Sequence, residues 1–342
     1  MKKYLSVYQE TKSKILSGEF KAGEKLLSKR VMADKTGTSV ITVEKAYSML
    51  CEEGYIVSKE KSGYFVAELD LPYKVELPKT EISYLEEEKF QESEDFEYSL
   101  WFKTVRKVIS ERGNRLFIKS PNKGCAVLRN SIADYLLRYR GMRAEPERII
   151  IGSGSEQLYE TVVKLLGRDK IYGIENPSYE QIETVYLSEY ANVKKLDMGN
   201  DGIKYLTDDV DILHVTPFKS YPTGVTTSAL KRYEYLKWAG DTKYIVEDDF
   251  NSEFFIPGQP IESLYSMDTK NRVIYINTFS KSLSPSMRVG YMILPPQLME
   301  KYNETVGRFS CSVPVLDQYI LAEFISSGNF ERHLNRVRRK LH

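Results

Sequence analysis

The residues of this 342-residue chain best suited to chemistry lie on a lysine-bearing segment that follows an apolar run. The run Arg272–Ile276 is almost continuously apolar, which predicts a buried strand. Lys281 follows it among small hydroxyl side chains such as Thr278 and Ser280, and Arg288 comes shortly after. A desolvated lysine amine can form a Schiff base with an aldehyde, while hydroxyls and a guanidinium can hold a phosphate. These residues together describe a pyridoxal phosphate site, although the segment alone is equally compatible with a surface loop.

Strand-like runs and amphipathic segments alternate after residue 119, which predicts an α/β domain. The run Arg148–Ile151 leads into Gly152–Glu156 and then a helix to Leu166. A strand, a Gly/Ser turn and a helix N-terminus together form an anion site, because free N–H groups and hydroxyls meet there. Many α/β proteins use such turns without binding phosphate, so the motif gains weight only beside Lys281.

Two further segments place functional groups after strands. The turn after the run Lys170–Ile174 presents the aromatic Tyr179, and Asp248 follows the run Tyr244–Glu247. Open α/β sheets bind ligands at the carboxyl ends of their strands, so we expect Asp248 to face a crevice. The alternative for Asp248 is a solvated turn residue.

The first 66 residues carry twelve Lys and Arg against eight Asp and Glu, although the net charge of the whole chain is only +1. Their apolar spacing predicts helices over residues 4–17 and 28–35 and a third helix that Ser39 caps. Two short β runs follow, Tyr55–Val57 and Tyr64–Val66, joined by a turn with Lys59 and Lys61. Three helices and a hairpin make a winged helix-turn-helix, whose third helix enters the major groove of DNA.

Residues 1–68 resemble the GntR-type winged helix. The matching segments are Gly18–Leu26, Ser28–Arg30, Thr42–Val43, Ala46–Tyr47, Leu50, Glu53–Tyr55 and Ser62–Val66. The resemblance implies contacts with an operator DNA through a set of polar residues on this surface: Arg30, Ser39, Thr42, Lys45, Lys59 and Lys61. The family often has arginine directly after the capping serine, where this chain has Val40, so we expect weaker base-specific readout. The alternative is a winged helix used only for protein contacts.

Residues 67–98 carry eleven Asp and Glu against three Lys, and two prolines fall within residues 69–98. Such an acidic stretch predicts an extended linker. We therefore expect three parts: a DNA-binding domain over residues 1–68, the linker, and an α/β domain over residues 99–342.

Residues 100–342 resemble the large domain of fold-type I, aspartate-aminotransferase-like enzymes. A GntR-type head joined to that domain is the architecture of MocR (GabR-like) regulators. The resemblance implies that Lys281 forms the Schiff base with pyridoxal 5'-phosphate, that Asp248 pairs with the pyridine nitrogen and that Tyr179 stacks on the ring. It also implies a phosphate cup formed by Gly154, Ser155, Thr278, Ser280 and Arg288. The Tyr221–Gly224 segment favours regulators, because plain aminotransferases usually have asparagine before that proline.

Two departures from the family pattern have consequences. Phe250 stands where the family usually has a tyrosine near the phenolic oxygen of the cofactor. The sequence also ends at the basic run Arg336–His342, within what resembles the helix leading to the family's small domain, so we expect that domain to be missing from this chain. We expect the basic run to be the exposed face of a helix rather than a second DNA contact.

The overall expectation is a multidomain transcriptional regulator with a winged helix and an aminotransferase-like domain. An amine or amino acid effector would exchange with Lys281 through an aldimine, and the resemblance implies a homodimer. The alternatives are a working aminotransferase with a vestigial head, and a DNA-binding protein whose α/β domain no longer holds the cofactor. Three scattered cysteines show neither a disulfide framework nor zinc spacing, so we expect no metal and a reducing cytoplasm. No apolar segment indicates export or a membrane span.

Overall fold

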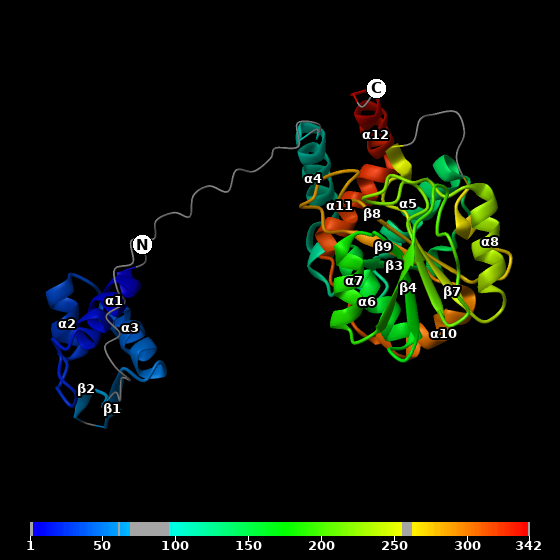
Figure 1. Cartoon of the computed structure of the whole chain (residues 1–342). Helices are drawn as coiled ribbons and strands as arrows, with labels where there is room; N and C mark the ends of the chain where they lie inside the picture. The colour runs from blue at the N-terminus through cyan, green and yellow to red at the C-terminus, as the bar shows by residue number, and fades with distance from the viewer. Residues whose placement is uncertain (1–2, 61, 69–95, 97, 255–261, 341–342) are drawn as a thin grey trace. The chain divides into compact units, whose positions relative to one another are not determined.

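The computed structural model describes residues 3–60, 62–68, 96, 98–254 and 262–340. The chain divides into two compact units, Met1–Phe90 and Gln91–His342 (Figure 1). The expected linker over residues 69–98 falls almost entirely outside the described residues.

The first unit is a winged helix-turn-helix. Its elements are α1 (Lys3–Leu16), α2 (Lys29–Thr36), α3 (Val40–Glu52), β1 (Ile56–Lys59) and β2 (Gly63–Val66). Ser28 and Ser39 cap α2 and α3 by accepting hydrogen bonds from Val31 N and Thr42 N, which satisfies amide groups that the helices leave free. Gly37 ends α2 in the left-handed conformation at φ 61°, which glycine adopts without strain.

The core of this unit forms where α3 packs on α1 and α2. Val43, Ala46, Tyr47 and Leu50 recur at helical spacing and are completely buried. The strands β1 and β2 pair antiparallel, from Ile56 opposite Val66 to Lys59 opposite Gly63. The winged-helix topology that the sequence predicted is therefore present.

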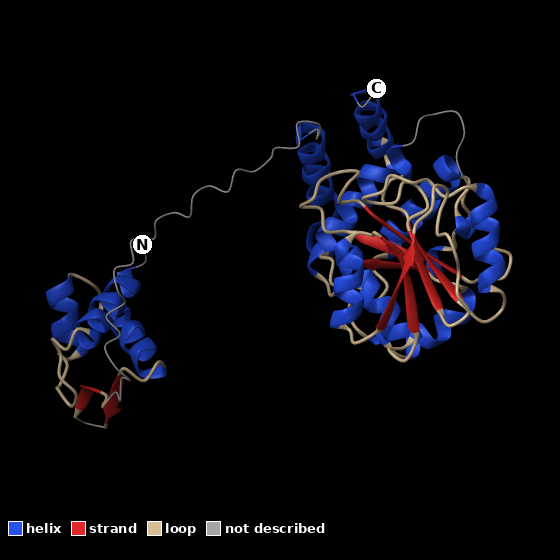
Figure 2. Cartoon of the chain, in the orientation of Figure 1, coloured by secondary structure: helices blue, strands red, loops and turns tan. Residues whose placement is uncertain are grey.

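The second unit is a seven-stranded sheet with helices on both faces (Figure 2). Its strands are β3 (Ile149–Gly152), β4 (Ile171–Asn176), β5 (Asn192–Asp197), β6 (Ile212–Val215), β7 (Tyr244–Asp248), β8 (Val273–Thr278) and β9 (Gly290–Ile293). Its α-helices are α4 (Tyr98–Arg112), α5 (Ala126–Tyr135), α6 (Ser155–Leu166), α7 (Glu180–Ser188), α8 (Ala229–Ala239), α9 (Leu264–Met267), α10 (Pro296–Glu304), α11 (Val315–Ser326) and α12 (Asn329–Lys340).

The strand order is β3-β9-β8-β7-β6-β4-β5, and β9 alone runs against its neighbours β3 and β8. The strands β3, β6, β8 and β9 are apolar along most of their length because helices cover both faces of the sheet, whereas the edge strand β5 is mostly polar. Ile274 and Ile276 of β8 pack into one core with α6 and α10, whereas Tyr275 between them packs into another with α5 and α11. This alternation confirms the α/β fold class.

The topology brings the carboxyl ends of six strands to one edge of the sheet. Strands β4, β5, β6, β7 and β8 are parallel, and β3 shares their direction because β9 lies between β3 and β8 and is antiparallel to both. The predicted strands correspond to the observed ones within a few residues, but β5 and β9 had not been predicted. Among the described residues, no helix is long and apolar enough to cross a membrane.

Candidate functional site

A pocket of about 310 Å³ opens at this carboxyl edge. Its lining comes from the ends of β6, β7 and β8, from the start of α6 and from the loops after β4 and β8: Ser155, Glu156, Tyr159, Tyr179, Thr216, Tyr221, Asp248, Phe250, Thr278, Ser280, Lys281 and Arg288. Seven of the eight residues predicted to hold the cofactor are among them. The eighth, Gly154, immediately precedes α6.

Lys281 lies three residues after the end of β8. Its amine donates a hydrogen bond to Asn251 Oδ1 and lies 4.9 Å from the centre of the Phe250 ring. Partial burial, together with the positive charge of Lys219, lowers the pKa of this amine, although Glu253 acts in the opposite direction. A lowered pKa increases the share of neutral amine, which is the nucleophilic form.

Asp248 is the last residue of β7 and is 4 % exposed, so it is not the solvated turn residue of the alternative interpretation. Its Oδ2 accepts a hydrogen bond from Tyr159 and lies 3.8 Å from His214 Nε2. Its Oδ1 is buried and has no hydrogen-bond partner among the described residues. A buried carboxylate oxygen without a partner is costly, so this oxygen is suited to a ligand N–H, such as a protonated pyridine nitrogen.

The side chains around Asp248 form a buried chain of contacts. His214 Nδ1 lies 2.7 Å from the Tyr186 hydroxyl, and Tyr159 packs edge-on against the His214 ring at 5.0 Å. Burial, followed by the negative charge of Asp248, raises the pKa of Tyr159 well above its ordinary value, which keeps that hydroxyl a donor. Sequence reasoning missed Tyr159, although its position four residues after Ser155 places both on one face of α6.

The residues predicted to hold a phosphate lie around the N-terminus of α6 and the loop that leads into β9. Gly154 has a φ of 95°, and a Cβ there would approach the Arg288 guanidinium to 3.2 Å, so glycine leaves room for that side chain. Arg288 pairs with Glu156 at 2.8 Å, and Ser280 Oγ donates to Met287 O at 3.0 Å. The carboxylate of Glu156 was not anticipated, and a phosphate in this cup would compete with it for Arg288.

Two aromatic residues border the pocket. Tyr179 precedes α7, is 43 % exposed and meets the Tyr221 ring edge-on with a centroid distance of 6.3 Å. Phe250 follows the Asp248–Asp249 pair and offers no hydrogen bond to a ligand. The residues therefore fit pyridoxal phosphate: a lysine amine, an unpartnered carboxylate oxygen, an exposed aromatic ring and an arginine at a helix N-terminus.

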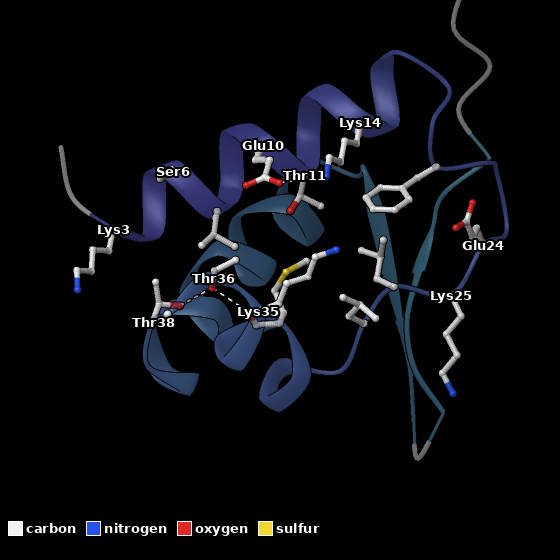
Figure 3. A pocket seen from close by; sticks show the side chains of 16 residues that line it. Lys3, Ser6, Glu10, Thr11, Lys14, Glu24, Lys25, Lys35, Thr36 and Thr38 are labelled. Atoms are coloured by element: carbon white, nitrogen blue, oxygen red, sulfur yellow. Dashed lines mark hydrogen bonds and ion pairs between the residues drawn. The ribbon is translucent and has the colours of Figure 1, made fainter.

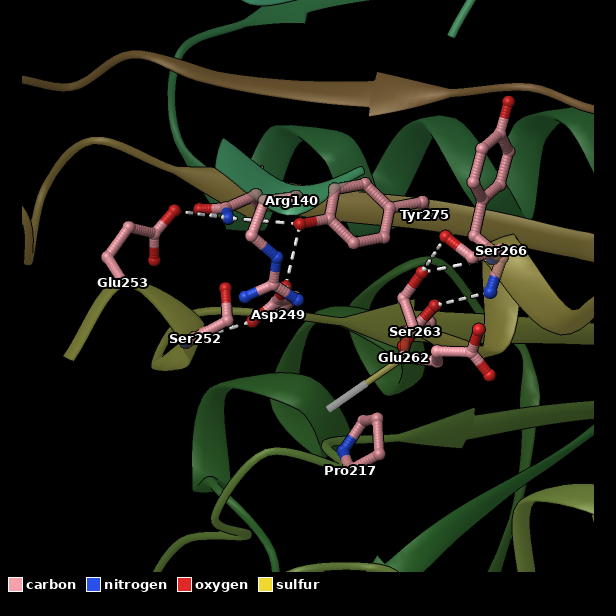
Figure 4. Close-up of polar contacts among 12 residues, drawn as sticks. Arg140, Pro217, Asp249, Ser252, Glu253, Glu262, Ser263, Ser266 and Tyr275 are labelled. Atoms are coloured by element: carbon pink, nitrogen blue, oxygen red, sulfur yellow. Dashed lines mark hydrogen bonds and ion pairs between the residues drawn. The ribbon is translucent and has the colours of Figure 1, made fainter. Parts of the chain in front are cut away.

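A buried polar network surrounds Asp249, Ser252 and Glu253 in the segment that follows β7 (Figure 4). Asp249 accepts from Arg140 at 3.2 Å and from the Tyr275 hydroxyl at 2.7 Å, while Glu253 accepts from Asn277 at 2.8 Å. Burial, together with the negative charge of Asp249, raises the pKa of Glu253 to about 7 against the opposing charge of Arg140. The sequence does not predict these partners of Asp249 and Glu253, because they come from other segments of the chain.

The terminal basic run corrects one expectation in detail. Arg338 of α12 donates to the backbone carbonyl of Glu253, so this arginine contributes to anchoring the same segment rather than only facing solvent. Arg339 and Lys340 are exposed, as expected for the outer face of a helix.

The predicted DNA-contacting residues lie on α2, α3 and the wing. Arg30 and Lys45 are exposed, and the Lys45 amine lies 4.5 Å from the centre of the Tyr4 ring. The Ser39 and Thr42 hydroxyls lie 2.8 Å apart at the start of α3, and Lys59 at the end of β1 lies over Phe65. Lys61 lies outside the described residues.

A groove of about 550 Å³ is a separate feature of the winged helix (Figure 3). It runs between α1, α2 and the segment before α2, with Val7, Leu26 and Met32 buried in its floor. Lys14 at its rim pairs with Glu10 at 3.1 Å. None of its lining residues comes from α3, so the groove is distinct from the outward face of the recognition helix.

Comparisons with known proteins agree with this geometry. The family of bacterial regulatory proteins called gntR matches residues 3–66. The HTH-type transcriptional regulator YdeL of Bacillus subtilis is 34 % identical over 98 % of this chain and 76 % of its own length. MocR of Rhizobium meliloti, a probable rhizopine catabolism regulatory protein, is 29 % identical over 97 % of this chain and 73 % of its own length.

Solved structures resemble the second unit. The α-aminoadipate aminotransferase LysN of Thermus thermophilus superposes with a TM-score of 0.63 and 26 % identity, over 72 % of this chain and 65 % of LysN. The chain thus spans about three quarters of the length of the two regulators and slightly less than two thirds of the length of the aminotransferase. This chain combines a gntR-type head with an aminotransferase-like fold, and it is similar to these regulators over almost all of its own residues. It therefore belongs to the MocR-type subfamily of GntR transcriptional regulators.

Proposed function

We propose that this chain regulates transcription by binding operator DNA through its winged helix and pyridoxal 5'-phosphate through its α/β domain, in response to an amine or amino acid. The observation that carries the cofactor assignment is that Lys281 and Asp248 line the same pocket. Asp248 offers a buried oxygen without a partner among the described residues, and Lys281 offers an amine of lowered pKa. A homodimer is the assembly that the resemblance to aminotransferases favours.

Six of the pocket residues have a direct role in this proposal. Bound pyridoxal phosphate supplies an aldehyde carbon that condenses with primary amines. Lys281 would anchor the cofactor, Asp248 would hold the charge of the ring nitrogen, and Tyr179 would cover the ring. Ser155, Thr278 and Arg288 would bind the phosphate together with the free amides at the start of α6. An effector amine would then compete with the Lys281 amine.

The test of cofactor binding uses the purified full-length protein. With pyridoxal phosphate it should turn yellow, and borohydride should attach the cofactor to the peptide that contains Lys281, as mass spectrometry would show. Lys281→Ala should abolish attachment of the cofactor while the protein stays folded. Lys301 is an exposed lysine on α10, and Lys301→Ala should alter neither cofactor attachment nor folding. Wild-type protein that stays colourless with added cofactor would contradict the assignment.

A working aminotransferase is the second candidate, because the fold is that of aminotransferases. Phe250 argues against efficient turnover, since it removes the hydrogen bond that the family's tyrosine gives the cofactor. We therefore expect amines to change the visible spectrum while little keto acid forms. Sustained conversion of an amino donor and a keto acid, lost in Lys281→Ala, would show that the enzyme alternative is correct.

A further inference from the structure

The recognition helix α3 exposes apolar side chains at its first turn. Ile41 is 77 % exposed and Val40 is 40 % exposed, whereas Val43, Ala46 and Leu50 of the same helix are completely buried. The exposed pair is therefore not part of the core. Single exposed aliphatic side chains are common on protein surfaces, so the significance of this pair depends on its position in the helix.

Helical periodicity places Ile41 directly opposite the core. Ile41, Lys45, Ser48 and Glu52 follow one another at spacings of four, three and four residues, so they share one face, and all four are exposed. Ile41 is the N-terminal member of that face. In helix-turn-helix proteins the N-terminal residues of the recognition helix contact base edges in the major groove. Branched aliphatic side chains therefore occupy the position that meets the bases.

The polar side chains near this pair already have partners within the protein. The Ser39 hydroxyl accepts from Thr42 N and lies 2.8 Å from the Thr42 hydroxyl. Glu44 pairs with Lys29 at 2.5 Å, and the Lys45 amine lies over Tyr4. The first turn of α3 carries no acidic residue. Apolar contact is thus the interaction that this end of the helix can offer most directly.

Among the groups that bases present in the major groove, the C5 methyl of thymine is the apolar one. We propose that Val40 and Ile41 recognise thymine by packing against its methyl group, and so provide sequence preference where related regulators use arginine. This inference rests on the proposed DNA binding and concerns which base edges the helix reads. DNA is the occupant we assign, because the pair lies on the outward face of a gntR-type recognition helix in a segment with surplus positive charge.

The experiment starts from the full-length protein and a library of random duplex DNA. Enriched duplexes are resynthesised with deoxyuridine in place of each thymine in turn, which removes only the methyl group and keeps base pairing. Affinity is measured by fluorescence anisotropy at fixed salt. We expect at least one uracil substitution to weaken binding about fourfold, the equivalent of ~0.8 kcal/mol for one buried carbon.

The variants connect this effect to the two side chains. Ile41→Ala and Val40→Ala should both have a lower affinity than wild type for the thymine duplex. At the contacted position, each variant should bind the thymine duplex and the uracil duplex with equal affinity. Because both side chains are exposed, neither variant should unfold the domain. Leu16→Ala is the matched control: Leu16 is 43 % exposed at the end of α1 and should leave the uracil effect unchanged.

Three results would overturn the proposal. The first is that uracil at any position of the selected DNA leaves the affinity unchanged. The second is that the alanine variants lose as much affinity on uracil substitution as the wild type does. The third is that the library yields no enriched sequence. A protein that binds no DNA at any salt concentration would instead contradict the proposed function itself. Equal loss of affinity for thymine and uracil duplexes in Ile41→Ala would show that the pair stabilises another contact, such as one between heads.

Discussion

Only one of the two oxygens of the Asp248 carboxylate has a hydrogen-bond partner among the described residues. Oδ2 accepts from Tyr159, and Oδ1 is buried without a partner among the described residues. Because Tyr159 and His214 surround the carboxylate from α6 and β6, it is held in one orientation before any ligand arrives. Such preparation of a charged acceptor lets it bind a cationic ring nitrogen without reorganising.

Asp248→Asn should weaken the retention of pyridoxal phosphate. The amide keeps the size of the side chain but removes the charge that would balance the ring nitrogen, and hydrogen bonds to charged groups contribute about 1.5–3 kcal/mol. We expect the dissociation constant of the cofactor, measured by absorbance titration, to rise roughly ten- to a hundredfold. Asp169→Asn, which changes an exposed carboxylate after α6, should leave it unaltered. Equal retention by Asp248→Asn and wild type would exclude the proposed role of Asp248.

Glu253 makes the stability of the α/β domain depend on pH. Its folded-state pKa of about 7 lies above the ordinary value, so the folded state binds more protons than the unfolded state between about pH 4.5 and 7. The contribution of this group to stability is therefore present at low pH and is lost as the pH rises through that window. At pH 8 Glu253 is a buried negative charge, which lowers the stability of the folded state.

Glu253→Gln should therefore stabilise the domain at pH 8, by about 1–3 kcal/mol, and change little at pH 5. Glutamine can still accept the hydrogen bond from Asn277. Both tryptophans, Trp101 and Trp238, belong to this unit, so urea unfolding followed by tryptophan fluorescence reports on it selectively. Glu300→Gln on the exposed side of α10 is the control. A stability change that is the same at both pH values would contradict the explanation.

The start of α3 depends on the cap that Ser39 provides. Its hydroxyl accepts from Thr42 N at 3.2 Å, and this bond satisfies one of the free amides of the first turn. Ser39→Ala should destabilise the helix by about 1 kcal/mol, whereas Ser39→Gly should cost only a few tenths. Hydrogen exchange of peptides from residues 3–66 measures this locally. Faster exchange in the glycine variant than in the alanine variant would contradict the capping role.

Exposed cations on α2 and α3 should determine how steeply DNA binding falls with salt. If Arg30 and Lys45 each neutralise one phosphate, Arg30→Ala and Lys45→Ala should each reduce the slope of log affinity against log salt by about one. Val40→Arg should raise affinity and steepen the slope, because it adds a cation at the groove. Unchanged slopes in both alanine variants would indicate that the head uses a different surface. Lys237→Ala on α8 is the control.

The whole molecule consists of two units with separate cores, so regulation requires that binding in one change the binding properties of the other. An effector does this only if it has different affinities for two states of the protein. Such coupling is reciprocal, because each ligand changes the affinity of the other by the same factor.

We therefore expect an amine that alters DNA affinity to bind with an equally altered affinity when saturating DNA is present, within the usual range of about five- to 150-fold. Visible absorbance gives the amine affinity and anisotropy gives the DNA affinity. Lys281→Ala should keep DNA binding and lose its response to the amine. Amine binding that leaves DNA affinity unchanged would show that the two units act independently.

Local patterns in the sequence were sufficient for the winged helix and for most of the sheet. Ser28, Gly37 and Ser39 mark the helix boundaries within one or two residues, because capping depends on neighbours in the chain. The apolar runs before Asp248 and Thr278 predicted strands, and their ends indicated where ligand-binding groups would gather. Since parallel strands share a carboxyl edge, Lys281 and Asp248 could be expected to meet.

Only the tertiary structure decided how the site is completed. Strand β9 inserts antiparallel between β3 and β8, which brings Arg288 beside Gly154 and Glu156. The donor to Asp248 comes from α6, and Arg140 and Arg338 anchor the segment that follows it. These contacts join residues that are tens to more than a hundred positions apart. They depend on strand order and helix packing, which no short-range periodicity encodes. The family resemblance had grouped Arg288 with Gly154, but nothing in the sequence predicted the contacts of Glu156, Tyr159, Arg140 and Arg338.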